Sequence, residues 1–279
     1  MLQIFNVRLP VIGMIHLPAL PGSPGCQVQQ GFGRVWAKLE ATVMADAHAL
    51  AEGGVDGIMI ENFGDVPFFP GPNPAHVLTL MTKIAGMVRQ TTRKPIGINV
   101  LRNDGASALA IALASDAQVI RVNVLSGARV TDQGIIQGGA HELLRYRQQI
   151  GAEHIAILAD VQVKHSSPLG AGASLAQDVD DLCNRALANG VIVSGSGTGK
   201  AVDLEALKAT KKAAGKHPVF IGSGATVGNL GEISKSADGL IVGTAFKAGG
   251  ILDSPVEVTR VLAFMAAVGV LRASFNQGS

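Results

Sequence analysis

The chain has 279 residues, with 23 Lys and Arg against 21 Asp and Glu and a formal net charge of +2. Apolar residues make up 47% and charged residues 16%, which excludes a disordered chain, and the balanced charge argues against a basic nucleic-acid-binding protein. Two distant cysteines, Cys26 and Cys183, form no redox or zinc motif, and a chain of this length can bury a large core without disulfides.

Eight short apolar runs predict strands that are covered on both faces, as in a parallel sheet. In chain order they are residues 11–17, 56–60, 95–101, 119–124, 155–161, 191–194, 219–221 and 239–242. Segments with helical periodicity separate them: residues 34–52, 74–90, 105–115, 140–150, 175–189, 203–214, 229–234 and 255–271. Asp203 and Ser254 are predicted N-caps, with Pro255 at the first helical position.

Eight strand–helix units without a linker or a composition shift predict an α/β fold, a single (β/α)8 TIM barrel over residues 1–279. An open doubly wound sheet is the alternative. No apolar run reaches the ~20 residues of a membrane-spanning helix, and the N-terminus lacks a secretory signal. We therefore expect a cytoplasmic protein without a transmembrane segment.

Polar residues gather where the predicted strands end, which in such a barrel is the active-site face. The catalytic candidates are His16, Glu61, Arg121, Asp160 and Lys164. Asn99, Asn123 and Asp132 are candidates for ligand binding, although each asparagine alone could simply close loop hydrogen bonds. A polar ring at one mouth of the barrel has a desolvation cost that structure alone does not require.

Arg121 and Asn123 alternate within an apolar strand, so both side chains point to the same side. If that side is the lumen, Arg121 needs a carboxylate partner, and Glu61 and Asp160 are the candidates. A buried ion pair and an anion-binding arginine both remain open at this point.

Glycine-rich loops after the last two strands predict a phosphate site at Gly222, Ser223, Gly224, Gly243 and Thr244. Residues 244–248 could form the short extra helix that accompanies such sites, although glycines also permit tight turns. The earlier loop 195–200 resembles a nucleotide motif but lacks the glycine and the Ser/Thr that a P-loop requires. Ser196 and Thr198 therefore remain secondary candidates for anion contact.

No metal site is predicted, because no local spacing of ligands would bring His16, Glu61 and Asp160 together around an ion. The sequence leaves the cofactor unknown. Two segments, residues 18–33 and 125–139, are candidate lids over the mouth.

Several strings resemble the BtpA/SgcQ family over nearly the whole chain. They are VIGMIHLP at 11–18, ENF at 61–63, PIGINVLRND at 95–104, IRVN at 120–123, TDQG at 131–134 and ILADV at 157–161, followed by Lys164 and His165. The resemblance implies a ribulose-phosphate-binding type of barrel. In photosynthetic relatives it implies a role in the accumulation and stability of photosystem I, peripheral to the thylakoid membrane. Relatives in organisms without photosystems suggest an older activity on a small molecule.

Two functions follow. The first is photosystem I biogenesis through contacts with photosystem I or thylakoid-associated proteins. The second is an enzyme acting on a phosphorylated sugar or nucleoside-type metabolite, with Glu61 or Asp160 as acid or base and Arg121 and Lys164 holding charge. In the second case Asp160→Asn stops turnover without unfolding, whereas unfolding would mark a structural ion pair. We also expect a homo-oligomer that associates through residues 105–115 and 262–271.

Overall fold

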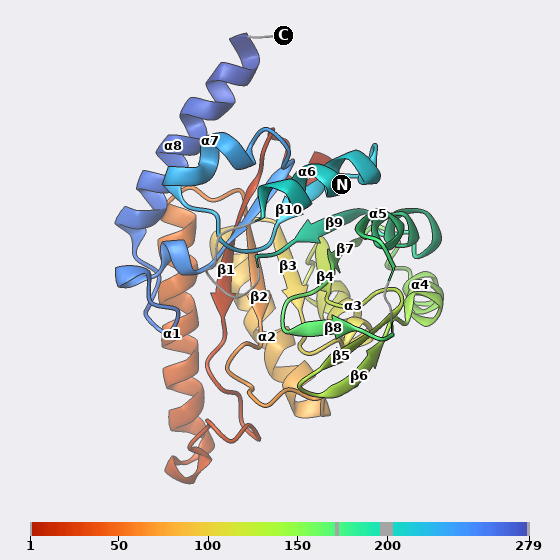
Figure 1. Cartoon of the computed structure of the whole chain (residues 1–279). Coiled ribbons are helices and arrows are strands. Elements are labelled where there is room, and N and C mark those ends of the chain that lie inside the picture. Colours follow the sequence, from red (N-terminus) through yellow and green to blue (C-terminus); the bar gives the residue numbers. More distant parts are fainter. Residues whose placement is uncertain (1, 171–172, 196–202, 278–279) are drawn as a thin grey trace.

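Eight parallel strands close into a barrel in the computed structural model, which describes residues 2–170, 173–195 and 203–277 (Figure 1). The strands are β1 (Val11–His16), β2 (Gly57–Glu61), β3 (Ile96–Asn99), β4 (Val119–Val122), β7 (Ala156–Val161), β9 (Gly190–Val193), β10 (Val219–Ile221) and β11 (Gly239–Val242). Because β1 pairs with both β2 and β11, the ring is complete. The predicted barrel is confirmed, and the open sheet is excluded.

Helices surround the barrel and follow its strands (Figure 1). They are α1 (Phe32–Glu52), α2 (Ala75–Thr92), α3 (Gly105–Ala114), α4 (Ala140–Gln149), α5 (Leu175–Asp180), α6 (Leu204–Ala214), α7 (Leu230–Ile233) and α8 (Val258–Gln277). Asp203 caps α6 as predicted, because its carboxylate accepts hydrogen bonds from the amides of Glu205 and Ala206.

The predicted boundaries of two helices are wrong, and the last helix also extends to Gln277 rather than residue 271. The helix expected at 175–189 ends at Asp180 and continues only as a π-helical turn over Asp181–Arg185. The last helix begins at Val258 rather than Pro255, so Ser254 does not cap it. The reason is that Val256 forms a β-bridge with Lys247 and donates its amide to Asp46 Oδ1 at 2.7 Å, which holds this segment extended.

Apolar side chains fill the lower part of the barrel interior. They come from alternate strand positions and from the N-terminal segment: Phe5, Ile12, Met14, Met59, Val119, Leu158, Ile192, Phe220 and Ile241. Gly57 lets the Phe5 ring enter, since a Cβ there would lie 2.7 Å from Phe5 Cε1. The outward positions pack against the helices in a second, larger core. The interior is thus closed at the amino ends of the strands, and the polar residues gather at the carboxyl ends.

A small antiparallel sheet stands outside the barrel where the sequence indicated only a loop. It consists of β5 (Ala128–Thr131), β6 (Gly134–Gln137) and β8 (Ser166–Pro168), in the order β6-β5-β8. The segment 125–139, predicted as a lid, is therefore a hairpin that pairs with the chain just after Lys164. Val130 and Ile135 are exposed on it, so the pattern of buried apolar residues that predicts strands is missing.

Helix α8 corrects the expectation that no segment is long and apolar enough to span a membrane. By length and composition, the helical segment Val258–Phe275 is long and apolar enough to span a membrane, and its mean hydropathy is 1.6. Helices of proteins outside membranes also meet this test. Here α8 packs beside α1 and its Val261, Phe264 and Val268 are buried (Figure 1). Its arginines also bind the barrel: Arg272 donates to the Leu9 carbonyl and pairs with Asp56.

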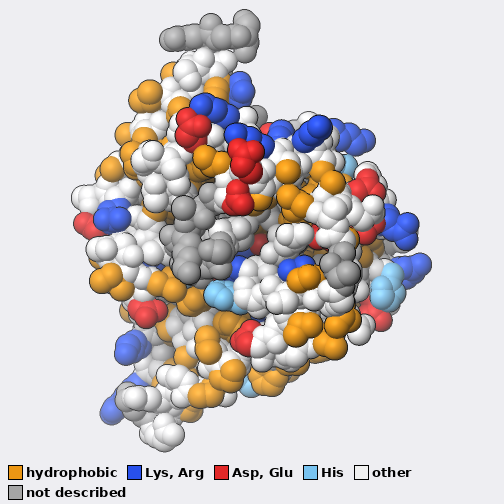
Figure 2. Space-filling model, in the orientation of Figure 1, with side chains coloured by type: hydrophobic (Ala, Val, Ile, Leu, Met, Phe, Trp, Pro, Cys, Tyr) orange, Lys and Arg blue, Asp and Glu red, His pale blue; other side chains and the backbone are white. Residues whose placement is uncertain are grey.

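The outer surface is divided between charged and apolar regions. Charged side chains gather over α6 and α7, where Lys208 pairs with Glu205 and Lys235 with Glu232, whereas the edge formed by α8 is largely apolar (Figure 2). Leu262 and Val270 are exposed on that edge. In α3, half of the residues are buried and Leu113 is the exposed large apolar side chain, so of the two helices expected to mediate association α8 presents the broader apolar face.

Candidate functional site

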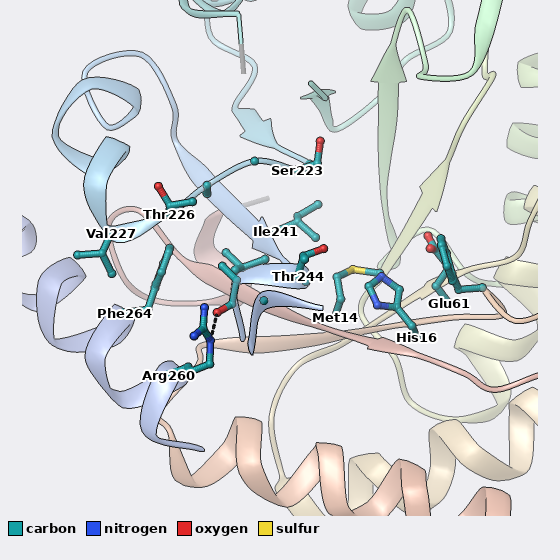
Figure 3. A pocket seen from close by; sticks show the side chains of 18 of the residues that line it. Met14, His16, Glu61, Ser223, Thr226, Val227, Ile241, Thr244, Arg260 and Phe264 are labelled. Carbon is teal, nitrogen blue, oxygen red and sulfur yellow. Dashed lines mark hydrogen bonds between the residues drawn. The ribbon is translucent and has the colours of Figure 1, made fainter. Parts of the chain in front are cut away.

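A cavity of about 560 Å³ opens at the carboxyl ends of the barrel strands (Figure 3). Its size falls within the range of small-molecule sites. The lining includes nine of the residues predicted from sequence: His16, Glu61, Arg121, Lys164, Gly222, Ser223, Gly224, Gly243 and Thr244. The fold therefore brings the predicted acid–base candidates and the predicted phosphate loops to one cavity.

Other predicted residues lie elsewhere. Asn123 and Asp160 line a neighbouring cavity of about 280 Å³ beside the antiparallel sheet. Asp132 is exposed at the turn of the β5–β6 hairpin, where it accepts a hydrogen bond from Gln133. Ser196 and Thr198 fall outside the residues that the structure describes.

The partner of Arg121 is Asp160. Arg121 Nε donates to Asp160 Oδ2 at 2.9 Å and Nη2 donates to Oδ1 at 2.8 Å, and both side chains are almost completely buried. Burial opposes the charge of the guanidinium, but the nearby carboxylate outweighs it and raises the pKa of Arg121 above its ordinary value. Arg121 is therefore a permanently charged group that two parallel hydrogen bonds hold in place.

Two further donors complete the surroundings of Asp160. Asn123 Nδ2 donates to its Oδ2 at 3.0 Å, and Ser194 Oγ donates to its Oδ1 at 3.2 Å. Asn99 Nδ2 extends this network to Asn123 Oδ1 at 3.2 Å, while Asn99 Oδ1 is buried without a partner among the described residues. With four hydrogen bonds on its two oxygens, Asp160 is an ion-pair member whose lone pairs are already engaged.

Glu61 has the opposite surroundings. It ends β2, beside His16 on β1 and Asn99 on β3, and is 6% exposed. No side chain or amide of the described residues donates a hydrogen bond to its carboxyl group, which faces the cavity. Burial raises the pKa of Glu61, although the charges of Arg121 and Lys164 partly offset the effect. The shift favours the protonated form, and a buried carboxyl group that faces a cavity is of the kind that acts as a general acid or base.

His16 is held as a neutral imidazole. Its ring packs against Phe63 with centroids 4.8 Å apart, and its Nδ1 is buried without a partner among the described residues. Burial, followed by the charges of Lys247, Lys164 and Arg121, lowers the pKa of His16 to about 3. Gly243 permits this position, because a Cβ there would lie 2.8 Å from His16 Cε1. A neutral imidazole can donate or accept a hydrogen bond to a ligand without adding charge.

Lys164 and Arg102 complete the polar side of the mouth. Arg102 Nη2 donates to the backbone carbonyl of Lys164 at 2.7 Å, which fixes the segment that follows β7. Burial, together with the charge of Arg121, lowers the pKa of Lys164. Arg102 is itself 5% exposed, and its Nε has no partner among the described residues. Cationic groups therefore concentrate on this side of the cavity.

Backbone amides dominate the opposite side. The loop after β10 contains Gly224 with φ of 78°, and the loop after β11 leads into a 3-10 turn over Thr244–Phe246. Within the described part of the chain, the amides of Gly224, Ala225, Thr244 and Ala245 donate to no other group. Gly222 has no room for a side chain, since a Cβ would lie 2.8 Å from Ser194 Oγ.

A buried ion pair holds the loop after β11 against α1. Lys247 Nζ lies 2.7 Å from Asp46 Oδ2, and both side chains are 4% exposed. Arg260 from α8 donates its Nε to the Ala245 carbonyl at 2.9 Å on the rim of the cavity (Figure 3). The sequence reasoning missed Arg260 and Phe264. Their only signal is their position near the start of the helix that follows the last strand.

Several polar residues near the mouth have structural tasks. Asp104 caps α3 by accepting the amide of Ser107 and also accepts the amide of Asn73. Asp65 accepts the amide of Leu20 and so ties the loop after β1 to the loop after β2. Among the described residues, no group of three or more His, Cys, Asp and Glu side chains could hold a metal ion.

Comparisons with known proteins agree in pointing to one family and one fold. The sequence profile of the BtpA family matches residues 7–269. The chain is 46% identical over 95% of its length to the photosystem I biogenesis protein BtpA of Synechocystis sp., covering 90% of that protein. It is 43% identical over 96% of its length to an uncharacterized protein of Thermococcus kodakarensis, covering 98% of that protein.

A solved structure shows the same fold at low sequence identity. Thiamine phosphate pyrophosphorylase from Pyrococcus furiosus aligns with a TM-score of 0.56 at 17% identity, over 94% of this chain and 96% of that one.

Proposed function

We propose that this chain, which belongs to the BtpA family, binds a phosphate-bearing small molecule in the mouth cavity and performs acid–base chemistry on it. One observation carries the proposal. The backbone amides of the two late loops, which donate no hydrogen bond within the described chain, line the same cavity as the Glu61 carboxyl, the neutral His16 and Lys164. Structural neighbours support it, since the name of the thiamine phosphate enzyme specifies a phosphorylated compound.

The phosphate end of the ligand lies at the loops after β10 and β11. Glycines allow the backbone to approach an oxyanion closely, and the amides of Gly224, Ala225, Thr244 and Ala245 supply donors without a competing partner in the described chain. Arg260 adds positive charge at the rim. The buried Lys247–Asp46 pair keeps the second loop in place before the ligand arrives, so little ordering is needed on binding.

The reacting end of the ligand lies toward Glu61. We assign the acid–base role to Glu61 rather than Asp160, because the Asp160 oxygens are occupied by Arg121, Asn123 and Ser194. Glu61 meets the cavity, and burial raises its pKa. Arg121 then supplies a fixed positive field beside the reacting atoms.

Inorganic phosphate tests the binding step. A ligand that binds only the folded state raises its stability, by about 2.7 kcal/mol at 100 times Kd. We expect phosphate to raise the melting temperature of the wild type and of Thr244→Asn, but not of Thr244→Asp, which places a negative charge at the same position. Native mass spectrometry of gently purified protein identifies a co-purifying phosphorylated compound. Equal stabilisation of all three proteins would reject the phosphate site.

A second candidate, photosystem I biogenesis, is favoured by the 46% identity to the Synechocystis protein of that name. It would place this chain at the thylakoid surface. The test is whether this chain restores photosystem I content in a Synechocystis strain that lacks its own relative. Restoration by the wild type but not by Glu61→Gln would make the role depend on the cavity. Failure of the wild type to restore would reject the candidate.

A further inference from the structure

We propose that Lys164 forms an imine with a carbonyl group of the bound molecule, so that phosphorylated aldehydes or ketones are the substrate class of this cavity. The inference rests on the proposed phosphate-binding function and deepens it. Its basis is the juxtaposition, in one cavity, of a lysine, a proton-exchanging carboxyl group and a phosphate-binding loop pair.

Lys164 differs from the other lysines that the structure describes. It is the one that lines the mouth cavity, together with Glu61 and Arg121. Lys247 lies in the loop after β11, where it is buried against Asp46 of α1, and Lys208 and Lys235 lie on the surface over α6 and α7. The backbone of Lys164 is fixed by Arg102 and by the pairing of the following strand, β8, with β5. The side chain therefore starts from an anchored segment.

The surroundings favour the neutral amine, which is the nucleophilic form of lysine. Lys164 is largely withdrawn from solvent, and burial lowers its pKa. The charge of Arg121 acts in the same direction and cannot be lost, because Asp160 holds this arginine through two hydrogen bonds. A neighbouring cation and desolvation are the two general means by which proteins activate a lysine.

Glu61 and His16 supply what the reaction needs besides the amine. Imine formation requires that a proton be given to the carbonyl oxygen and that the nitrogen lose protons. Burial raises the pKa of Glu61, which favours the protonated form of its carboxyl group, and this group faces the same cavity as Lys164. The neutral His16 can hydrogen bond to the same oxygen without repelling Lys164 electrostatically.

The step balances without an oxidant or a reductant. Lys164 Nζ attacks the carbonyl carbon, the C–N bond forms, and the carbonyl oxygen takes a proton from Glu61. The nitrogen returns a proton to Glu61, which completes the carbinolamine. The remaining nitrogen proton then reaches the hydroxyl group through Glu61, the C–O bond breaks and water leaves. The product contains a C=N bond, and the carboxyl group of Glu61 has returned to its initial protonation state.

Reductive trapping tests this step on the intact protein. Glyceraldehyde 3-phosphate is added with cyanoborohydride, which reduces an imine to a stable secondary amine, and peptide mass spectrometry locates the label. We expect Lys164 to be labelled several times faster than the exposed Lys208, because burial lowers the pKa of Lys164 and so increases its fraction of neutral amine. Unphosphorylated glyceraldehyde should label Lys164 slowly, and inorganic phosphate should protect it.

The outcomes separate the two proposals. Stabilisation by phosphate together with labelling no faster at Lys164 than at Lys208, or confined to another lysine such as Lys200, overturns the imine and leaves the phosphate site standing. Fast labelling of Lys164 by both aldehydes, without protection by phosphate, overturns the assignment of a phosphorylated substrate. The set of lysines that is labelled in the wild type decides between these outcomes. Lys164→Arg keeps the positive charge but forms no imine, so it serves as the control.

Discussion

Asp160 and Glu61 are two buried carboxyl groups at the same barrel mouth with opposite surroundings. Asp160 accepts hydrogen bonds from Arg121, Asn123 and Ser194, whereas Glu61 accepts none from the described residues and faces a cavity. Because a buried charge without partners is costly, the hydrogen bonds of the first arrangement offset the cost of burial, and the second arrangement leaves that cost without compensation. This difference is the reason for assigning a structural role to Asp160 and, in the proposed function, the ligand-facing role to Glu61.

We expect the largest loss of stability when the carboxylate of Asp160, the closed group, is removed. Asp160→Ala leaves Arg121 charged and buried without the carboxylate that accepts its two hydrogen bonds, and breaking a buried pair in this way typically costs about 3–5 kcal/mol. Denaturant unfolding measures the loss, with Asp132→Ala as the control, because that carboxylate is exposed and its removal should change stability by less than about 0.5 kcal/mol. A stable but inactive Asp160 variant would instead return Asp160 to the catalytic role that its position in the sequence suggested.

The Lys247–Asp46 pair should show a smaller loss of the same kind. Lys247→Met removes one charge and keeps the length of the side chain, while Asp46 retains the hydrogen bond from the Val256 amide. We expect about 3 kcal/mol of destabilisation, at the low end for a broken buried pair. The variant should also bind phosphate more weakly, since the loop after β11 loses its anchor to α1. Unchanged phosphate binding would show that this loop is positioned without the ion pair.

The barrel could be predicted from the sequence because its strands are local features. Each strand is an apolar run covered on both faces. Each of the eight observed strands lies within a predicted run or extends at most one or two residues beyond it. The antiparallel sheet could not be predicted, since β5 and β8 are short, half-exposed segments that pair across more than 30 residues. The start of α8 was missed because Val256 is held by Asp46, which lies on α1.

The site could be predicted only as a set of candidates. Their positions at the ends of strands follow from the sequence, and the cavity includes most of them. Strand order favours Asp160 as the partner of Arg121, since Asp160 lies on the adjacent strand and Glu61 lies two strands away. The hydrogen bonds that Asn123 and Ser194 add to Asp160, and the cavity beside Glu61, do not follow from strand order. The contrast between the closed and the open carboxyl group is thus information that only the folded chain provides.

His16 sharpens the contrast through its dependence on pH. Its pKa falls from 6.5 to about 3 on folding, so the unfolded chain binds the proton first as the pH falls. Stability from this group is present above pH 6.5 and is lost toward pH 3, by about 1.4 kcal/mol per pH unit. We expect the stability of the wild type to fall more steeply than that of His16→Gln in acid. Parallel curves would mean that His16 accepts a proton in the folded state.

Glu61→Gln should have the smallest effect on stability and a large effect on function. Glutamine keeps the shape of the side chain and lacks the charge, so we expect stability within about 1 kcal/mol of the wild type. The direction should depend on pH: the folded state raises the pKa of Glu61, so the wild type loses stability as the pH rises above the unfolded value of 4.5, and glutamine does not.

In thermal melts, the stability of Glu61→Gln relative to the wild type should therefore increase from pH 4 to 8. For Asp160→Ala we expect the opposite sign, a loss of stability relative to the wild type. It should still bind phosphate, because the phosphate loops lie on the other side of the cavity. If Glu61→Gln instead unfolds the protein as Asp160→Ala should, then Glu61 is a second structural carboxylate. In that case the acid–base role proposed for the open group must be given up, whatever the cavity binds.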